Sequence, residues 1–152
     1  MSLVQNVKRA AGGLLMVGGL FSQVAVTEAQ MPMTRDPGHR VVFHLNSADE
    51  QIQKGLLNNI TNLYEALGQD VLRVEVVAHG SGLSLLSKKG SRFAGEVARL
   101  KQQYGVQFTA CSNTMKAQGL AREHLLDQVD RTVPAIVRLM ELREEGWSYI
   151  KP

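Results

Sequence analysis

The sequence is poor in the residues that usually mark a specialised class of protein. One cysteine and one tryptophan occur among 152 residues, aromatic residues make up 5%, and the formal net charge is only +3. The single cysteine excludes a disulfide bond within the chain. Basic residues are scattered, and their densest group, Lys88, Lys89 and Arg92, is typical of a solvated surface. Because there is no basic stripe, we expect no nucleic-acid partner.

Metal-binding and cofactor-binding motifs are also missing. Four histidines and one cysteine are dispersed along the chain, without the three or four suitably spaced ligands that a metal site needs. Gly80 and Gly82 form a lone G-x-G, which is neither a full dinucleotide-binding pattern nor a phosphate-loop pattern. The sequence therefore predicts neither a metal nor a cofactor. Its apolar content of 44% and charged content of 20% are those of one ordinary globular domain.

The N-terminal residues have the layout of a secretory signal peptide. Lys8 and Arg9 precede an apolar stretch over 10–26, and small residues follow up to Ala29, after which we predict cleavage. The stretch contains four glycines and falls short of the roughly 20 strongly apolar residues of a bilayer span, so an uncleaved membrane anchor is the alternative. Residues 30–39, rich in proline and mixed charges, are predicted to be a linker. The mature protein would be periplasmic or otherwise exported.

From residue 41 on, short apolar runs alternate with helical patterns. Residues 41–45, 71–80 and 106–110 have the continuous apolar character of buried strands, and weaker strands are expected around 131–136 and 147–150. Alternating strands and helices favour a parallel sheet that is covered on both faces. We therefore predict an α/β fold, a three-layer α/β/α sandwich with a mainly parallel five-stranded sheet, formed by residues 40–152.

The first two helices have clear boundary signals. Ser47 and Glu50 have the spacing of a capping box at a helix start, and Gly68 and Gly105 are suited to ending the two helices. One apolar stripe at a helical period is predicted to face the core in each helix: Ile52, Leu56, Ile60, Leu63 and Leu67 in the first, and Phe93, Val97, Leu100 and Tyr104 in the second. Two further helices are expected, over about 113–122 and around Val137 and Met140.

Polar segments follow each of the three main predicted strands. In parallel sheets, ligands gather at the carboxyl ends of the strands, where loops join strand ends to helix starts. We therefore expect these segments to converge and to form an anion-binding or ligand-binding site. The residues concerned are Asn46 after the first strand, His79, Gly80 and Ser81 after the second, and Cys111, Ser112, Asn113 and Thr114 after the third.

Cys111 is predicted to lie directly after a strand and just before a helix that Ser112, Asn113 or Thr114 would cap. Free amides and aligned peptide dipoles at a helix start favour a thiolate over a thiol, so the pKa of this cysteine would lie below the usual value of about 8.5. Free cysteines are also among the most buried residues of proteins and often only fill space. The sequence alone leaves the reactive and the inert interpretation open.

Histidines are the candidate bases for such a thiol. His79 ends the strand that should lie next to the one carrying Cys111, and a Cys-His pair would raise the reactivity of the sulfur. The alternative is that His79 is a loop histidine bonded to the backbone. His44 lies within an apolar run and is expected to be a hydrogen-bonded core histidine, whereas His39 and His124 are expected at the surface.

Four segments of the chain resemble the DsrE/DsrF-like family of small α/β proteins: VVFHLNS, VEVVAHG, FTACSNTMKAQGL and the ending LREEGWSYIKP. The resemblance covers residues 40–152 and is most specific in the Cys-x-Asn-Thr-Met segment and the Gly-Trp-x-Tyr-Ile-x-Pro ending. Members of this family form trimers or hexamers, and several accept a sulfane sulfur as a cysteine persulfide and pass it on. The cysteine of the family's loop after the third strand matches Cys111.

The resemblance implies an exported sulfur-carrier or sulfurtransferase-like protein that acts as a homotrimer or homohexamer. Cys111 would hold the persulfide, and His79 with the amides around 112–114 would stabilise the anion. Sulfur donor and acceptor proteins are the implied partners, and membrane contact is expected only if the N-terminal segment stays uncleaved. Two alternatives remain: a non-catalytic ligand-binding or assembly module with Cys111 packed at a subunit junction, and a redox protein that forms an intermolecular disulfide.

Overall fold

The computed structural model describes residues 38–152, so the predicted signal peptide of 1–29 and most of the predicted linker lie outside the described residues. The strands are β1 (His39–Leu45), β2 (Leu72–Ala78), β3 (Gln107–Cys111), β4 (Arg131–Val133) and β5 (Ser148–Ile150). The helices are α1 (Glu50–Leu67), α2 (Ala94–Tyr104), α3 (Ser112–Ala117) and α4 (Ala135–Glu144), with 3-10 helices η1 (Gly80–Leu86) and η2 (Arg122–His124). Within this part of the chain, no helix combines the length and the apolar character that a bilayer crossing requires.

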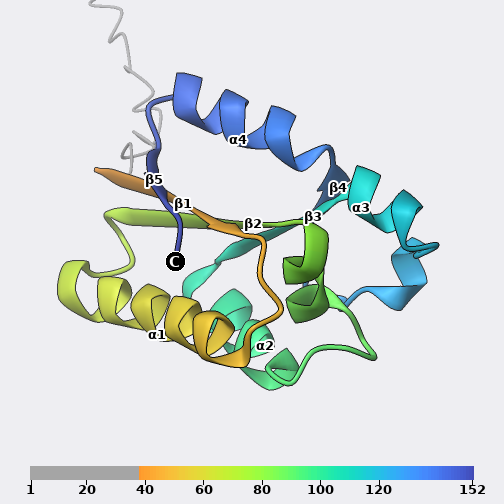
Figure 1. Ribbon diagram of the computed structural model, residues 1–152. Coiled ribbons are helices and arrows are strands. Elements are labelled where there is room, and N and C mark those ends of the chain that lie inside the picture. Colours follow the sequence, from red (N-terminus) through yellow and green to blue (C-terminus); the bar gives the residue numbers. More distant parts are fainter. Residues whose placement is uncertain (1–37) are drawn as a thin grey trace, which may run out of the picture. The chain divides into compact units, whose positions relative to one another are not determined.

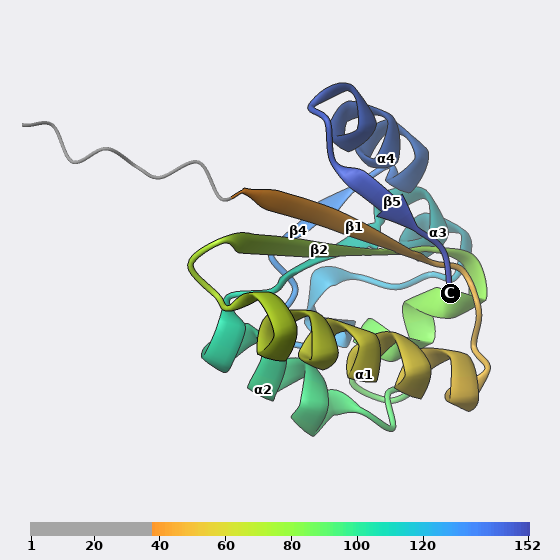
Figure 2. The same ribbon diagram turned by 90° about the vertical axis from the view of Figure 1, so that its left-hand side faces the viewer.

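The five strands of the described residues form one parallel sheet with the order β4-β3-β2-β1-β5. Helices α1 and α2 cover one face of the sheet and α4 covers the other, whereas α3 lies beside β4 at the end of β3 (Figures 1 and 2). The predicted three-layer α/β/α sandwich is confirmed, and its sheet is wholly rather than mainly parallel. All the strands therefore end at the same edge of the sheet.

The larger hydrophobic core lies between the sheet and the pair α1 and α2. Leu56 and Ile60 of α1, Leu100 of α2, Val76 of β2 and Phe108 of β3 are all fully buried in it. Burying one such side chain contributes about 1.5–3 kcal/mol. This core holds β1, β2 and β3 in register, and so fixes the positions of their carboxyl ends.

The start of α1 differs from the predicted capping box. Asp49 is the N-cap residue, and its Oδ1 accepts hydrogen bonds from the amides of Gln51 at 2.8 Å and Ile52 at 3.0 Å. The Ser47 hydroxyl instead accepts a hydrogen bond from the amide of Asp49 at 3.1 Å. Aspartate is as strong an N-cap as serine, and here it lies directly before the helix. The capping box between Ser47 and Glu50 was therefore a wrong prediction.

The buried face of α1 is rotated away from the predicted stripe at its C-terminal end. Leu67 was expected to face the core but is 41% exposed, whereas Tyr64 is buried. The predicted stripe takes steps of four, four, three and four residues from Ile52 to Leu67, on average slightly more than the 3.6 residues of a turn, so its last member lies off the buried face. In α2 the predicted face is confirmed, since Val97 and Leu100 are fully buried. Gly105 ends α2 as predicted, with a left-handed φ of 69°.

The junction between β3 and α3 is tighter than predicted. The strand runs one residue further, so that Cys111 is both its last residue and the N-cap position of α3. The helix covers only Ser112–Ala117 rather than 113–122, and none of the three expected capping residues occupies the cap. Cys111 therefore lies at the junction itself.

The chain turns from strand to helix earlier than predicted near residue 134. Ala135 and Ile136, expected at the end of a strand, begin α4 instead. Pro134 has no amide hydrogen for a strand ladder, and its restricted φ suits the approach to a helix. Helix α4 packs on a second, smaller core that contains Val42, Val77, Cys111, Ala135, Leu139, Leu142 and Trp147. The cysteine is thus enclosed by the start of α4.

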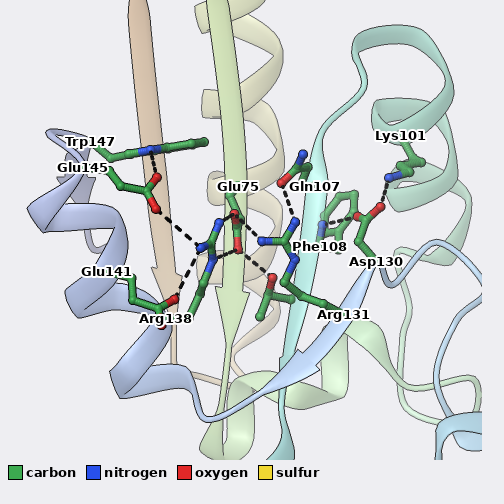
Figure 3. A network of polar contacts seen from close by, with 11 residues as sticks. Glu75, Lys101, Gln107, Phe108, Asp130, Arg131, Arg138, Glu141, Glu145 and Trp147 are labelled. Carbon is green, nitrogen blue, oxygen red and sulfur yellow. Dashed lines mark hydrogen bonds and ion pairs between the residues drawn. The ribbon is translucent and has the colours of Figure 1, made fainter.

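A buried carboxylate ties α4 to the sheet (Figure 3). Glu75 of β2 is fully buried and accepts two hydrogen bonds from the Arg138 guanidinium of α4, at 3.0 and 2.8 Å. The Thr109 hydroxyl donates to the same carboxylate at 2.6 Å, and Arg131 of β4 lies 3.6 Å from it. A bidentate pair of this kind constrains both the position and the rotation of the helix. Ala135, one turn before Arg138, is thereby held over the end of β3.

Candidate functional site

The three predicted polar segments meet at the carboxyl ends of β1, β2 and β3. The amide of Gly80 donates a hydrogen bond to the Thr114 hydroxyl oxygen at 2.9 Å, which joins the loop after β2 to α3. The Ser81 hydroxyl donates to the carbonyl oxygen of Asn46 at 2.9 Å, which joins the same loop to the end of β1. The predicted convergence is therefore confirmed.

The loop after β2 can approach β1 so closely because residue 82 is glycine. A Cβ at Gly82 would lie only 2.6 Å from the carbonyl oxygen of Leu45. A pocket of about 320 Å³ opens beside this loop, and Ser81, Lys89 and Gln118 are among the residues that line it. A cationic group and polar hydrogen-bond donors are the features by which proteins bind small anions.

Cys111 is buried, with 6% of its surface exposed, yet its sulfur faces hydrogen-bond donors as well as hydrocarbon. The amide of Ala135, at the start of α4, lies 3.5 Å from the cysteine Sγ. The Thr114 side chain and the amides of Asn113 and Thr114, in the first turn of α3, also act on the pKa of this thiol. Donors from two helices therefore converge on one thiol.

These donors lower the pKa of the Cys111 thiol below its ordinary value. Burial alone raises this pKa, because it disfavours the charged form. Hydrogen bonds from the Thr114 side chain and from the amides of Ala135, Thr114 and Asn113 lower it, and together they outweigh burial. The site thus makes the thiolate, which is the nucleophilic form of cysteine, easier to form than in a free cysteine.

Replacing Thr114 by valine tests the largest of these hydrogen bonds. The variant keeps the size of the side chain but removes the hydroxyl that donates to Cys111, so the pKa of the thiol should rise. Because a hydrogen bond to a charged group contributes about 1.5–3 kcal/mol, alkylation by iodoacetamide at neutral pH should slow by about tenfold or more. The measurement is the alkylation rate as a function of pH. Thr132→Val, at an exposed position of β4, is the matched control and should leave the profile unchanged.

The ring of His79 is hydrogen-bonded to a partner that neither interpretation of the sequence named. Its Nε2 lies 2.6 Å from Nε2 of His44, and Nδ1 of His44 lies 2.5 Å from the Tyr149 hydroxyl oxygen. Within residues 38–152, the His79 ring is therefore hydrogen-bonded to His44 and not to Cys111. His44 is buried and hydrogen-bonded as expected for a core histidine, but its partners place it at the site. His39 and His124 are exposed, as predicted.

Sequence reasoning missed Tyr149 and Ala135 as parts of the site. Tyr149 is 105 positions from His44 in the sequence, and parallel pairing of β5 with β1 brings the two together. Tyr149 does lie in the distinctive Gly-Trp-x-Tyr-Ile ending, which was the available signal. Nothing in the sequence around Ala135 marks a main-chain amide that donates to a thiol.

The remaining predicted site residues have peripheral positions. Ser112 is half-buried in the first turn of α3, and the Asn113 side chain is exposed, so Asn113 contributes its amide rather than its side chain. Among the residues that the structure describes, no three His, Cys, Asp or Glu side chains gather closely enough to hold a metal ion.

The fold and the site define a small α/β protein with one polarised cysteine at the carboxyl edge of a parallel sheet. The sequence pattern of the DsrE/DsrF-like family matches residues 40–152, and the chain belongs to this family. The family is generally related to sulfur relay. No curated protein is significantly similar in sequence.

Three solved structures are similar to this chain. A protein of unknown function from Methanobacterium thermoautotrophicum, MTH1491, is 37% identical with a TM-score of 0.69, over 75% of this chain and 99% of that chain. The ychN protein from E. coli is 16% identical with a TM-score of 0.58, over 75% and 99% of the two chains. BT1422 from Bacteroides thetaiotaomicron is 13% identical with a TM-score of 0.54, over 74% and 94%. The last two similarities show the fold alone.

Proposed function

We propose that this protein carries sulfane sulfur as a persulfide on Cys111. The proposal rests above all on the hydrogen bond from the Ala135 amide to the only thiol of the chain, together with the lowering of that thiol's pKa by the Thr114 side chain. Such donors stabilise the anion that attacks sulfur. Membership of a family that is generally related to sulfur relay supports the same chemistry.

The proposed step is a transfer between two sulfur atoms. The Cys111 thiolate attacks the outer sulfur of a donor persulfide, R–S–S–H, and forms a new S–S bond. The S–S bond of the donor breaks, and its electron pair leaves on R–S⁻. Attack on the loaded Cys111 by the thiolate of an acceptor reverses the same chemistry. The hydrogen bonds that stabilise the free thiolate also stabilise Cys111 when it becomes the leaving group.

We extend the proposal to export and to self-association. The layout of residues 1–29 supports an exported, periplasmic location. The outer face of α4 supports a homotrimer or homohexamer, because its large apolar side chains Ile136, Val137 and Met140 are exposed. The partners would be a sulfur donor protein and a sulfur acceptor protein.

The direct test is to load the protein with sulfur and weigh the peptide that contains Cys111. After incubation with cysteine persulfide, the peptide should gain one sulfur atom and lose it again on treatment with a thiol reductant. Cys111→Ser is the control and should gain none. If the wild-type peptide never gains sulfur, and its thiol alkylates with the pH dependence of a free cysteine, the carrier function is refuted.

The second candidate function is a non-catalytic assembly module with Cys111 packed at a subunit junction. The low exposure of Cys111 and the apolar outer face of α4 favour it. The two functions differ in how iodoacetamide labels the native oligomer. Rapid labelling of Cys111 supports the carrier, whereas protection in the oligomer and labelling only after dissociation support the assembly module.

A further inference from the structure

Three titratable side chains form a hydrogen-bonded chain beside the cysteine. The Tyr149 hydroxyl lies 2.5 Å from Nδ1 of His44, and Nε2 of His44 lies 2.6 Å from Nε2 of His79. The two imidazole rings are inclined by only 21°, and their centroids lie 4.8 Å apart. The two Nε2 atoms are 2.6 Å apart and lie between the ring centroids. The rings therefore meet edge to edge, as an N–H···N hydrogen bond requires.

The sheet register places the hydrogen-bonded series Tyr149, His44 and His79 beside the strand that carries Cys111. His44 of β1 is opposite Val77, and His79 is two residues beyond Val77, so alternation along β2 places both histidines on the face covered by α4. Cys111 is on the same face, since it contacts Ala135 of α4. Ala78 of β2 is paired with Ala110 of β3. His79 directly follows the first alanine, and Cys111 directly follows the second. Neighbouring strands lie about 4.8 Å apart, so the chain ends one strand from the thiol.

The other end of the chain is open to solvent. Tyr149 lies in the edge strand β5 and is 41% exposed, whereas His44 is only 9% exposed. Cys111 is also buried, with 6% of its surface exposed. His79, at the end near Cys111, is itself partly exposed. The three side chains therefore connect the solvent at the edge of the sheet with the strand end beside a buried thiol.

The hydrogen bonds permit two arrangements of protons. In one, the Tyr149 hydroxyl donates to Nδ1 of His44, Nε2–H of His44 donates to His79, and His79 carries its proton on Nδ1. In the other, Nε2–H of His79 donates to His44, and Nδ1–H of His44 donates to the Tyr149 oxygen. Passing from one arrangement to the other moves a proton along the whole chain, because both nitrogens of His44 take part.

We propose that Tyr149, His44 and His79 form a proton relay that returns a proton to the leaving thiolate when Cys111 takes up sulfur. The proposal rests on the carrier function proposed above. When the donor S–S bond breaks, R–S⁻ takes a proton from His79, which takes one from His44. His44 takes one from Tyr149, and the Tyr149 oxygen recovers its proton from water. The net change is one proton moved from solvent to R–SH, with no oxidation or reduction beyond the sulfur transfer itself.

Burial, and after it nearby charges, lowers the pKa of both relay histidines and so favours their neutral forms at neutral pH. Burial lowers the pKa of His44, and the charges of His79 and Lys151 lower it further. Burial and Lys151 likewise lower the pKa of His79. A neutral imidazole has one donor and one acceptor nitrogen, so it can pass a proton on. A proton entering the relay is held weakly for the same reason, and so it is readily given to a thiolate.

The test compares two reactions of Cys111. Sulfur transfer needs a proton for the leaving thiolate of the donor, whereas alkylation by iodoacetamide does not. Tyr149→Phe and His44→Gln each interrupt the relay, and Tyr104→Phe, in the opposite layer, is the matched control. Single-turnover transfer from cysteine persulfide to Cys111 is measured as a function of pH for the full chain. Both relay variants should transfer sulfur about tenfold to a hundredfold more slowly above pH 7, with unchanged alkylation rates. Added imidazole should restore much of the loss in His44→Gln.

The outcomes distinguish the relay from the carrier function. If the wild-type protein gains sulfur and both variants gain it equally fast, the relay is refuted and the carrier function stands. If transfer and alkylation slow together, the side chains act only on the structure around Cys111, and the relay is also refuted. If the wild-type protein gains no sulfur, both proposals fail. Tyr149→Phe removes only one hydroxyl group from a partly exposed side chain, so it provides the test even if His44→Gln does not fold.

Discussion

Replacing Arg138 by methionine is expected to lower the free energy of unfolding by about 3–5 kcal/mol. The reason is that Glu75 is fully buried and receives two hydrogen bonds from Arg138, so the variant leaves a charged carboxylate without its main partner. Arg131 and Thr109 remain near the carboxylate and keep the loss toward the lower end of that range. Urea denaturation of the wild-type protein and the variant measures the difference.

Two further variants distinguish the contribution of the buried pair to stability from that of the exposed charges around it. Glu141→Gln removes a partner that lies 3.5 Å from Arg138 but is 48% exposed, and it should change stability by less than about 0.5 kcal/mol. The double variant Glu75→Leu with Arg138→Met removes both buried charges, so it should recover much of the loss. If Arg138→Met costs no more than Glu141→Gln, the buried pair does not hold α4 to the sheet.

Replacing Gly82 by alanine is the second change with a large expected effect. The added Cβ would lie 2.6 Å from the carbonyl oxygen of Leu45 and 2.9 Å from Cα of Asn46, both of which are main-chain atoms that cannot rotate away. Overpacking of this kind costs about 1–3 kcal/mol. The displaced loop also carries Gly80, whose amide bonds to Thr114, so alkylation of Cys111 should slow as well.

Gly55→Ala is the matched control for this variant. Gly55 lies inside α1, and a Cβ there would meet no atom within 4 Å apart from the neighbouring backbone of the helix itself. Alanine is favoured over glycine inside a helix by roughly 0.5–1 kcal/mol, so the control should raise stability while Gly82→Ala lowers it. Thermal unfolding and the alkylation rate are measured for both. Equal stability of the two variants would show that the loop moves aside at no cost.

The sequence predicted the layers and the location of the site because both depend on local patterns. Apolar runs marked the buried strands, and Gly105 marked the end of α2 correctly. Loops after parallel strands must share one edge, so the convergence of the residues near Gly80 and Thr114 followed from the expected parallel arrangement of the strands. Local patterns failed where two signals competed, as where Asp49 rather than Ser47 caps α1.

The partners of the site residues were not predictable, since they come from distant parts of the chain. Arg138 is 63 positions from Glu75, and Tyr149 is 105 positions from His44. Such contacts depend on which strand pairs with which and on how α4 is rotated, and a single sequence contains neither. His79 was correctly placed next to the strand of Cys111, but its ring is hydrogen-bonded to His44 instead.

Because the amide of Ala135 bonds to Cys111, the lowered pKa of this thiol depends on a segment that follows the cysteine in the chain. During synthesis the cysteine is made well before α4, and a short helix such as α3 is not stable alone. A nascent or truncated chain that ends before residue 134 therefore lacks the Ala135 amide, and the pKa of its cysteine should lie closer to that of a free thiol. The lowered pKa of Cys111 therefore depends on completion of the fold by α4.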